Sequence, residues 1–320
     1  MLEKLNHGLG NSNSATDLGG LEVIIPDQVS TITGISTQEF AKKITKVLSR
    51  HIEILSGKSG KIFKNAPETA VTLVEVPELP VLCVKQFNDR GLLHSLKGLF
   101  RQSHGSRTFE NGLKLLSNGI PAATPLALIR QRHLGLIRVE WVIMEFMRNH
   151  TELDRYLLGK FKAGWTRDQQ KSAVRQFGRF IGSMHSKGIF HSDLKTCNIM
   201  VSEGSTPGQN CDEALGSETK DDSISLRFCL IDYDDVRFSH QMSMRSRIKN
   251  MVQIFLSTPL LLNGVERMRF LDEYALHAGL NSSEKKRLAQ NVIKKCQGKD
   301  ILYVGFDGDV IEPLNPKQQN

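Results

Sequence analysis

The sequence of 320 residues has few cysteines, and none of them form a CxxC pair. The five are scattered along the chain: Cys83, Cys197, Cys211, Cys229 and Cys296. An odd number without zinc-ligand spacing argues against a disulfide framework or a zinc site, and it suits a reducing compartment. We therefore expect packing, rather than cross-links or a structural metal, to hold the fold together.

Long apolar runs and targeting signals are also lacking. The longest apolar stretch, around Met251 to Leu262, is interrupted by Gln253, Ser257 and Pro259, and it is too short to span a bilayer. The first residues, MLEKLNHGLG, have no basic region followed by an apolar run, so no signal peptide is predicted. The sequence indicates a cytoplasmic protein, and a peripheral contact with a membrane stays open.

Acidic residues are fewer than basic ones: Lys and Arg total 42 against 34 Asp and Glu, which gives a net charge of +8. This excess favours an anionic partner, either nucleic acid, a phosphate-rich membrane surface, or a nucleotide with a phosphorylated acceptor. A solubilising surface charge is an equal alternative. No basic motif interleaved with aromatics is present, so no nucleic-acid partner is expected.

The patterns along the chain predict an α+β fold with two lobes. Residues 1–36 are rich in Gly, Asn, Ser and Thr, which predicts a loosely ordered N-terminal extension. Residues 37–147 are predicted to form a small β-rich N-lobe with one helix among its strands, and residues 148–320 a mainly helical C-lobe. The polar segment 202–222 is expected to be a flexible insertion in the C-lobe.

Local patterns also predict single elements. Helices are expected over 37–51 and 106–117, and a third begins at the capping box of Thr166 and Gln169 and ends near Ser186. The strands expected in the N-lobe are 52–55, 61–64, 70–76, 80–87, 125–132 and 137–147. Two short strands, 199–201 and 228–231, flank the polar insertion.

The strongest chemical signal is GIFHSDLKTCNIMV, residues 188–201. His191, Asp193, Leu194, Lys195 and Asn198 match the H-x-D-L-K-x-x-N pattern of a kinase catalytic loop. Phosphoryl transfer needs a carboxylate beside the acceptor hydroxyl, a cation near the γ-phosphate and an amide oxygen for the metal. The pattern therefore predicts Asp193 and Lys195 as catalytic residues and Asn198 as a metal ligand.

A second motif, FCLIDYDDVRF, covers residues 228–238. An apolar strand that ends in an aspartate is how this fold places its second metal ligand. Asp232 directly follows Leu230 and Ile231 and takes the position of the aspartate in D-F-G. Asp234 and Asp235 are expected to be structural or to face solvent. Together the two motifs predict ATP and Mg²⁺ as the nucleotide and the metal.

The nucleotide-binding residues are predicted in the N-lobe. Lys85 lies at the end of a hydrophobic strand, where a charge is costly without a partner. In kinases such a lysine pairs with the α and β phosphates and with a glutamate on the following helix, for which Glu110 is the best candidate. An exposed strand end for Lys85 and a solvated helix face for Glu110 are the alternatives. The backbone of Glu145 and Met147, in the expected inter-lobe hinge, is predicted to bind adenine.

These residues together resemble the lipopolysaccharide kinase family, the enzymes that phosphorylate Kdo or heptose in the lipopolysaccharide inner core. The resemblance covers about Ile62 to Leu262 and includes IFKNAPETAV, VKQF, TFENGLKLLSNGIPAATPLAL, HSDLKTCN and LIDYDDVRF. It implies a protein-kinase-like bilobed fold, ATP with Mg²⁺, and an anionic glycolipid or sugar acceptor. It also implies peripheral contact with the cytoplasmic face of the inner membrane.

Two other interpretations stay open. Lys195, two residues after Asp193, is equally typical of a RIO-like serine/threonine protein kinase. A pseudokinase that serves as a binding module is disfavoured because Lys85, Asn198 and Asp232 are all present. No A-P-E segment follows Asp232, which favours a small-molecule or glycolipid acceptor over a peptide. Basic residues that would suit an anionic sugar include Lys97, Arg101, Arg107, Arg130, Arg132, Arg138, Arg245 and Arg247.

Overall fold

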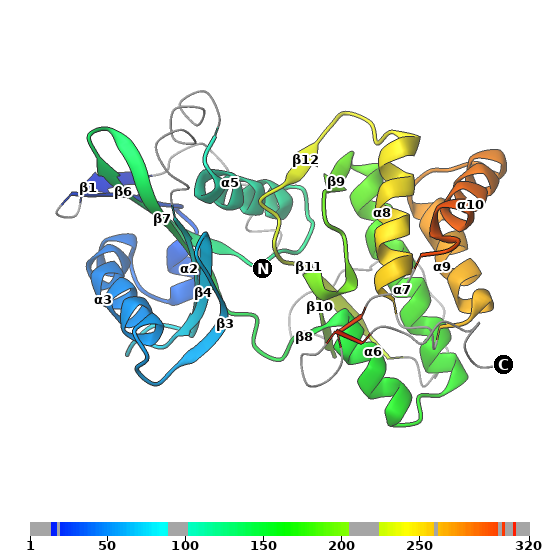
Figure 1. The fold of residues 1–320 in the computed structure, drawn as a ribbon, viewed down its shortest axis with the longest axis horizontal. Helices are drawn as coiled ribbons and strands as arrows, with labels where there is room; N and C mark the ends of the chain where they lie inside the picture. The colour runs from blue at the N-terminus through cyan, green and yellow to red at the C-terminus, as the bar shows by residue number, and fades with distance from the viewer. Residues whose placement is uncertain are drawn as a thin grey trace. The chain divides into compact units, whose positions relative to one another are not determined.

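The computed structural model describes residues 14–17, 20–88, 102–204, 224–258, 262–299, 303–304 and 310–311. The chain divides into two compact units, residues 1–148 and 149–320, so the division falls one residue after the expected boundary (Figure 1). Most of the expected flexible insertion at 202–222 lies outside the described residues, although residues 202 and 203 end strand β10.

Within the described residues of the first unit, seven strands form one antiparallel sheet. Their order across the sheet is β1-β2-β6-β7-β5-β4-β3. In chain order the strands are β1 (Ser14–Asp17), β2 (Leu21–Ile25), β3 (Lys61–Ala66), β4 (Thr69–Val74), β5 (Leu82–Asn88), β6 (Pro125–His133) and β7 (Leu136–Glu145).

Two helices cover opposite faces of this sheet, α3 (Thr37–Leu55) and α5 (His104–Ser117) (Figure 1). Successive side chains of a strand point to opposite faces. On β5, Leu82 and Val84 therefore join the core beneath α3, whereas Lys85 lies on the other face. Helix α5 contacts β5, β6 and β7 on that face.

Helix α3 forms because its apolar residues recur at helical spacing. Ser36 caps its N-terminus by accepting a hydrogen bond from the backbone N–H of Glu39 at 3.2 Å. His51 and Ile54 continue the buried face of the helix, while Ile52 is 51% exposed. The prediction of a strand at 52–55 is therefore wrong, because these residues form the last helical turn.

The prediction of a loosely ordered extension over 1–36 is wrong for residues 21–33. Strand β2 pairs with β6, and helix α2 (Val29–Thr33) follows it. Val23, Ile25 and Val29 are at most 1% exposed and belong to the core beneath α3. Within residues 37–147, where one helix was expected among the strands, the structure has α5 among the strands and α3 ahead of them, close to the two helical segments expected at 106–117 and 37–51.

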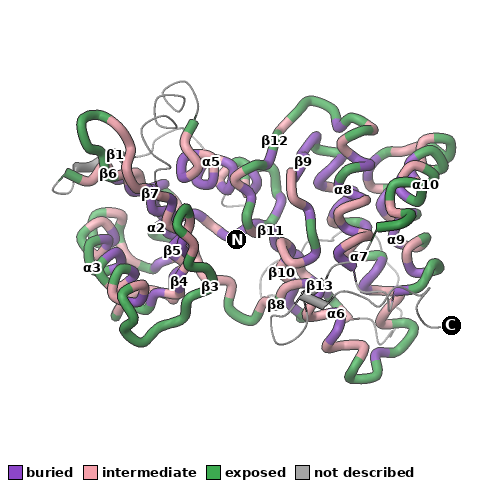
Figure 2. Tube along the Cα trace, viewed as in Figure 1, coloured by how far each residue is buried: buried purple, intermediate pink, exposed green. Residues whose placement is uncertain are grey.

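The second unit is mainly helical. Its helices are α6 (Leu153–Lys162), α7 (Arg167–Ser186), α8 (Met244–Ser257), α9 (Gly264–His277) and α10 (Ser282–Cys296). The capping box that begins α7 is confirmed: Thr166 Oγ1 accepts from the Gln169 N–H at 3.2 Å, and the Gln169 side chain accepts from the Thr166 N–H at 3.1 Å. Helix α10 buries Leu288 and Val292 and is otherwise largely exposed (Figure 2).

Short strands carry the two chemical motifs of this unit. They are β8 (Thr151–Glu152), β9 (Ile189–His191), β10 (Ile199–Glu203), β11 (Leu226–Leu230) and β12 (Val236–Phe238), while β13 (Tyr303–Val304) pairs with β14 (Val310–Ile311). The predicted catalytic loop runs from β9 through a 3₁₀ turn, η1 (Thr196–Asn198), into β10. None of the described helices combines the length and the apolar character that crossing a membrane requires.

Candidate active site

The loop after β9 brings three of the predicted site residues together. The Lys195 Nζ lies 3.0 Å from Asp193 Oδ1. The Asn198 side chain donates from Nδ2 to the Asp193 carbonyl oxygen at 2.8 Å and to Asp193 Oδ2 at 3.3 Å. The side chains of Asp193 and Lys195 are 48% and 52% exposed, so a ligand can reach both. The sequence prediction that one tight loop holds these groups is consistent with this geometry.

Asp232 is joined to the same loop through the β10–β11 hairpin. In the register of the hairpin, Ile199 pairs with Leu230, and the Ile231 N–H donates to the Asn198 carbonyl at 3.0 Å. Asp232 therefore follows the strand at the hairpin end where Asn198 lies. Its φ of 55° is in the left-handed region, which few residues other than glycine adopt and which is common at functional sites.

The imidazole of His191 connects the two motifs. Its Nδ1 accepts from the Asp193 N–H at 3.2 Å, and its Nε2 lies 3.3 Å from the Ile231 carbonyl oxygen. These contacts require a neutral ring with the hydrogen on Nε2. Burial lowers the pKa of His191 and outweighs the hydrogen bond to Ile231 and the nearby carboxylates, which raise it. The neutral His191 ring therefore bonds the backbone of Asp193 on one side and that of Ile231, the residue before Asp232, on the other.

Two amide side chains of α8 hold the backbone of the loop. Asn250 Nδ2 donates to the His191 carbonyl at 2.6 Å. Gln253 Nε2 donates to the Ser192 carbonyl at 2.7 Å, and Gln253 Oε1 accepts from the Leu194 N–H at 3.3 Å. These backbone groups are therefore satisfied by side chains rather than by secondary structure, which fixes the loop without a ligand.

Ser257, one turn further along α8, completes this support. Its Oγ accepts from the Thr196 N–H at 3.0 Å, and its carbonyl accepts from Thr196 Oγ1 at 2.6 Å. These three supporting residues were not predicted from the sequence. The pattern that could have revealed them is the spacing of Asn250, Gln253 and Ser257, which places three polar side chains on one face of a helix.

The donor atoms near this loop fit Mg²⁺. The described residues contain no group of three or more His, Cys, Asp or Glu that could hold a metal by itself. Mg²⁺ does not need such a cage, because it prefers oxygen ligands and usually binds one or two protein groups together with phosphates and water. The Asn198 amide and the Asp232 carboxylate are oxygen donors of this kind at one hairpin end.

The first unit contains the predicted nucleotide-binding lysine on β5. Lys85 is 9% exposed, and its Nζ lies 5.0 Å from the ring centroid of Phe87. The Phe87 ring stacks on that of His104, the first residue of α5, with centroids 5.9 Å apart. The structure thus links Lys85 to the start of α5 through two rings.

The other predicted nucleotide-binding residues also belong to the first unit. The Glu110 carboxylate, on α5, is 44% exposed, accepts from Gln102 Nε2 and lies 3.9 Å from Lys114 Nζ. Its pairing with Lys85 stays a prediction. The Glu145 N–H donates to the Thr124 carbonyl at 2.9 Å, so a bond from Glu145 to a base would use its carbonyl oxygen. Met147 lies beyond the end of β7.

Comparison with known proteins adds a family match. The model of the Lipopolysaccharide kinase (Kdo/WaaP) family matches residues 93–259. Comparison with curated protein sequences finds no match. A solved structure of WaaP in complex with acyl carrier protein is similar, with 16% identity, a TM-score of 0.47, and coverage of 75% of this chain and 92% of that chain.

A second similar structure is the Rio2 kinase–ADP/Mg²⁺–phosphoaspartate complex from Chaetomium thermophilum. Its identity to this chain is 12%, its TM-score is 0.37, and the alignment covers 79% of this chain and 76% of that chain. The family match includes the motifs at Asp193 and Asp232 and spans more than half of the sequence. The chain therefore belongs to the lipopolysaccharide kinase (Kdo/WaaP) family and is a kinase with the α+β, kinase-like fold expected from its sequence.

Proposed function

We propose that this kinase transfers the γ-phosphate of ATP to a hydroxyl of a Kdo or heptose sugar in the lipopolysaccharide inner core. The observation that carries the proposal is the grouping of Asp193, Lys195 and Asn198 in one loop, with Asp232 joined to it through the Ile231–Asn198 hydrogen bond. A carboxylate, a cation and two oxygen donors are the groups that phosphoryl transfer needs.

Asp193 acts on the acceptor in this mechanism. Its carboxylate orients the sugar hydroxyl and takes the hydroxyl proton as the oxygen forms its bond to the γ-phosphorus. The bond between that phosphorus and the β–γ bridging oxygen breaks, and ADP leaves. Lys195, whose Nζ is 3.0 Å from Asp193 Oδ1, keeps the carboxylate in place and supplies positive charge beside the transferred group.

The remaining residues bind the nucleotide and the metal. Asn198 and Asp232 would hold Mg²⁺, which when bound neutralises charge on the phosphates. We assign Lys85 to the α and β phosphates, with Glu110 as its partner, and the backbone of Glu145 and Met147 to adenine. These assignments follow the roles of the matching positions in kinases.

The acceptor determines where the reaction takes place. An inner-core sugar on its lipid is an anionic glycolipid, and a protein of net charge +8 is attracted to anionic surfaces. We therefore propose a cytoplasmic enzyme that contacts the cytoplasmic face of the inner membrane peripherally while it acts.

The first prediction tests the two carboxylates. Asp193→Asn and Asp232→Asn should each lower phosphate transfer by on the order of 10²–10³ or more, because each removes a charge that the reacting groups need. The measurement is transfer from γ-labelled ATP to extracted lipopolysaccharide precursors, followed by location of the label on the sugar. Asp272→Asn is the matched control, since Asp272 is exposed on α9 and pairs with Lys285.

Three outcomes would change the proposal. Wild-type turnover in a folded Asp193→Asn variant would remove this residue from the mechanism. Label found in protein rather than in sugar would favour the RIO-like protein kinase instead. Equal losses in Asp272→Asn and the two site variants would show that the assay reports general damage.

A further inference from the structure

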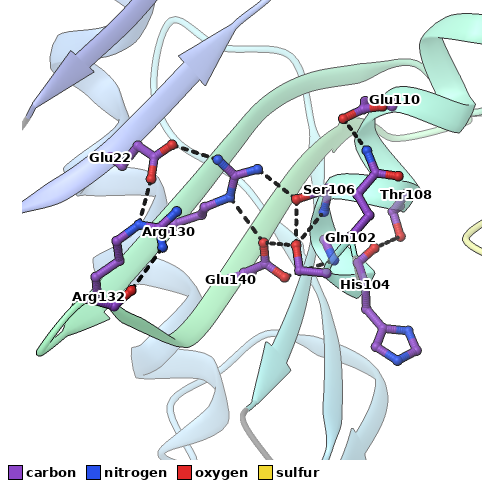
Figure 3. A network of polar contacts seen from close by, with 12 residues as sticks. Glu22, Gln102, His104, Ser106, Thr108, Glu110, Arg130, Arg132 and Glu140 are labelled. Atoms are coloured by element: carbon purple, nitrogen blue, oxygen red, sulfur yellow. Dashed lines mark hydrogen bonds and ion pairs between the residues drawn. The ribbon is translucent and has the colours of Figure 1, made fainter. Parts of the chain in front are cut away.

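We propose that Glu140 and Arg130 are positioning residues that hold the first turn of α5, and with it Lys85 and Glu110, in place for ATP. This inference rests on the proposed function, in which Lys85 and Glu110 bind the nucleotide. The contacts that carry it join strands β2, β6 and β7 to α5, and all of them lie within the first unit (Figure 3).

The carboxylate of Glu140 binds the start of α5. Glu140 lies on β7 and is 3% exposed. It accepts from Ser103 Oγ at 2.6 Å and from the Gly105 N–H at 3.0 Å. The first N–H groups of a helix have no partner within the helix, and its N-terminus carries partial positive charge. The buried Glu140 carboxylate accepts one of these N–H groups and places a negative charge at the positive end of the helix. It thereby attaches the helix to the sheet.

Gly105 lets the helix approach this carboxylate closely. A Cβ added at position 105 would lie 2.8 Å from both Cβ and Cδ of Glu140, which is closer than real carbon contacts allow. The first turn of α5 is therefore fitted against Glu140, and any larger side chain at 105 would push the two apart.

Arg130 connects this contact to the N-terminal strand. Its Nε lies 3.2 Å from Glu140 Oε1, its Nη2 donates to Ser106 Oγ at 2.6 Å, and its Nη1 donates to Glu22 Oε1 at 2.6 Å (Figure 3). Glu22, on β2, also accepts from Arg132 Nε at 2.9 Å. One guanidinium thus bonds to β7, α5 and β2, and its planar donors hold all three in a fixed arrangement.

The charges of this network are balanced. Burial raises the pKa of Glu22, but the hydrogen bonds from Arg132 and Arg130 and their positive charges outweigh it and leave the pKa below its usual value. Arg130 and Arg132 were expected from the sequence to suit an anionic sugar. In the structure Arg130 binds Glu22 and Glu140, and Arg132 binds Glu22.

The same turn of α5 reaches the nucleotide-binding residues by two routes. The His104 ring stacks on the Phe87 ring, and the Lys85 ammonium lies over the same Phe87 ring, 5.0 Å from its centroid. Gln102, just before the helix, donates to the Glu110 carboxylate. A shift of the first turn would therefore move both Lys85 and Glu110, and misplacing a binding group by about 1 Å can cost roughly 10²-fold in rate.

The second prediction tests this inference by comparing the Glu140→Gln variant with wild type. The variant keeps the size of the side chain and loses the charge that Arg130 and the helix start bind. We expect kcat/KM for ATP to fall roughly 10- to 100-fold, with a raised KM for ATP and an unchanged KM for the acceptor. Amide hydrogen exchange in the first turn of α5 should become faster. Glu140→Asp, which keeps the charge, should recover part of the loss.

Two further variants sharpen this comparison. Glu53→Gln is the matched control, because Glu53 on α3 forms surface ion pairs with Arg50 of the same helix and with Lys58 beyond its end, and it should behave as wild type. Adding Glu140→Gln to Glu110→Gln should cost less than the sum of the two single losses, since both act through α5.

The inference is overturned if Glu140→Gln keeps the wild-type KM for ATP and the wild-type exchange of α5. A fall in kcat alone, matched by a smaller folded fraction, would also overturn it, because that pattern indicates a purely structural ion pair. If Glu140→Gln does not fold, the same two measurements on Glu22→Gln decide the question. The Glu22 carboxylate also binds Arg130 and is partly exposed, so its neutralisation costs less stability. If wild type itself does not turn over ATP, the proposed function fails, and the exchange of α5 still decides whether Glu140 holds this helix.

Discussion

At the scale of single residues, the protonation of His185 is fixed by its neighbours. The ring is fully buried, with Nε2 3.1 Å from Asn250 Oδ1 and Nδ1 2.9 Å from the Tyr274 hydroxyl. Because an amide oxygen only accepts, Nε2 carries the hydrogen and Nδ1 accepts from Tyr274. Tyr274 in turn accepts from Arg247 Nη1 at 2.9 Å. Burial, with the charge of Arg247, lowers the pKa of His185 to about 3.

This lowered pKa gives the third prediction. The unfolded chain binds the proton near the ordinary value of 6.5, so the contribution of neutral His185 to stability is complete above that pH. It is lost as pH falls from 6.5 toward 3. The free energy of unfolding should therefore fall with pH less steeply in His185→Gln than in wild type. Urea unfolding between pH 7.5 and 4.5 measures the slopes.

His133→Gln is the control for this titration, because His133 is exposed at the end of β6. It should follow the wild-type slope. If His185→Gln follows that slope as well, the acid sensitivity comes from other groups, such as the buried His191.

The candidate catalytic residues could be proposed from the sequence, whereas the residues that support them could not. Asp193, Lys195 and Asn198 lie within one short loop, where the chemistry fixes both residue type and spacing. Gln253 and Glu140 act on loops and helices far from them in sequence, and neither residue type has a spacing that reveals its partner. Arg247 is a similar case. The sequence suggested that it would suit an anionic sugar, but it is 6% exposed and donates to the Tyr274 hydroxyl within the second unit.

At the scale of elements, two glycines set the spacing between α7 and α9. A Cβ at Gly178 would lie 2.7 Å from the Phe270 carbonyl oxygen, and one at Gly182 would lie 2.8 Å from the Tyr274 carbonyl oxygen. The neighbouring atoms include backbone, which cannot turn aside as a flexible side chain can. The two helices therefore pack at a distance that only glycine allows at these positions.

The fourth prediction follows from this packing. Gly182→Ala should lower the free energy of unfolding by about 1–3 kcal/mol, because α7 must move away from α9 to admit the methyl group. Gly264→Ala is the matched control: no atom lies within 4 Å of its added Cβ, and alanine favours the helix. Denaturant unfolding of both variants gives the comparison, and equal stabilities would show that the helices separate at little cost.

Prediction of the elements succeeded where a local rule decided them. The capping box of Thr166 and Gln169 fixed the start of α7, because both partners lie within one turn. It failed at residues 52–55, whose alternating Ile and Glu also suit a strand. What decides in favour of a helix there is the sheet that α3 covers, and this sheet is formed by residues distant in sequence.

At the scale of the whole molecule, the chain offers one tryptophan to report on each unit. Trp141 belongs to the first unit and Trp165 to the second, and they are 7% and 8% exposed. Variants that keep one tryptophan and replace the other by phenylalanine would therefore follow the unfolding of each unit separately.

The fifth prediction uses these reporters. Ile25→Ala should destabilise the first unit by about 2–5 kcal/mol, because Ile25 is 1% exposed in the core beneath α3. The urea transition followed by Trp141 should move to lower concentration, while the transition followed by Trp165 should stay. An unchanged Trp141 transition would mean that β2 contributes little to this core. Leu21→Ala, at a partly buried position of the same strand, should have a smaller effect.

The pairing of β2 with β6 also has a consequence for biosynthesis. Glu22 and its partner Arg130 are 108 residues apart, so a ribosome releases the first of these strands long before the second exists. Throughout that interval β2 has β1 as a neighbour, but its other edge, which later pairs with β6, stays open, and an open strand edge is the kind of segment that associates with other chains. Slow or interrupted translation before residue 133 would prolong this exposure, and we expect aggregation of the newborn protein to rise with it.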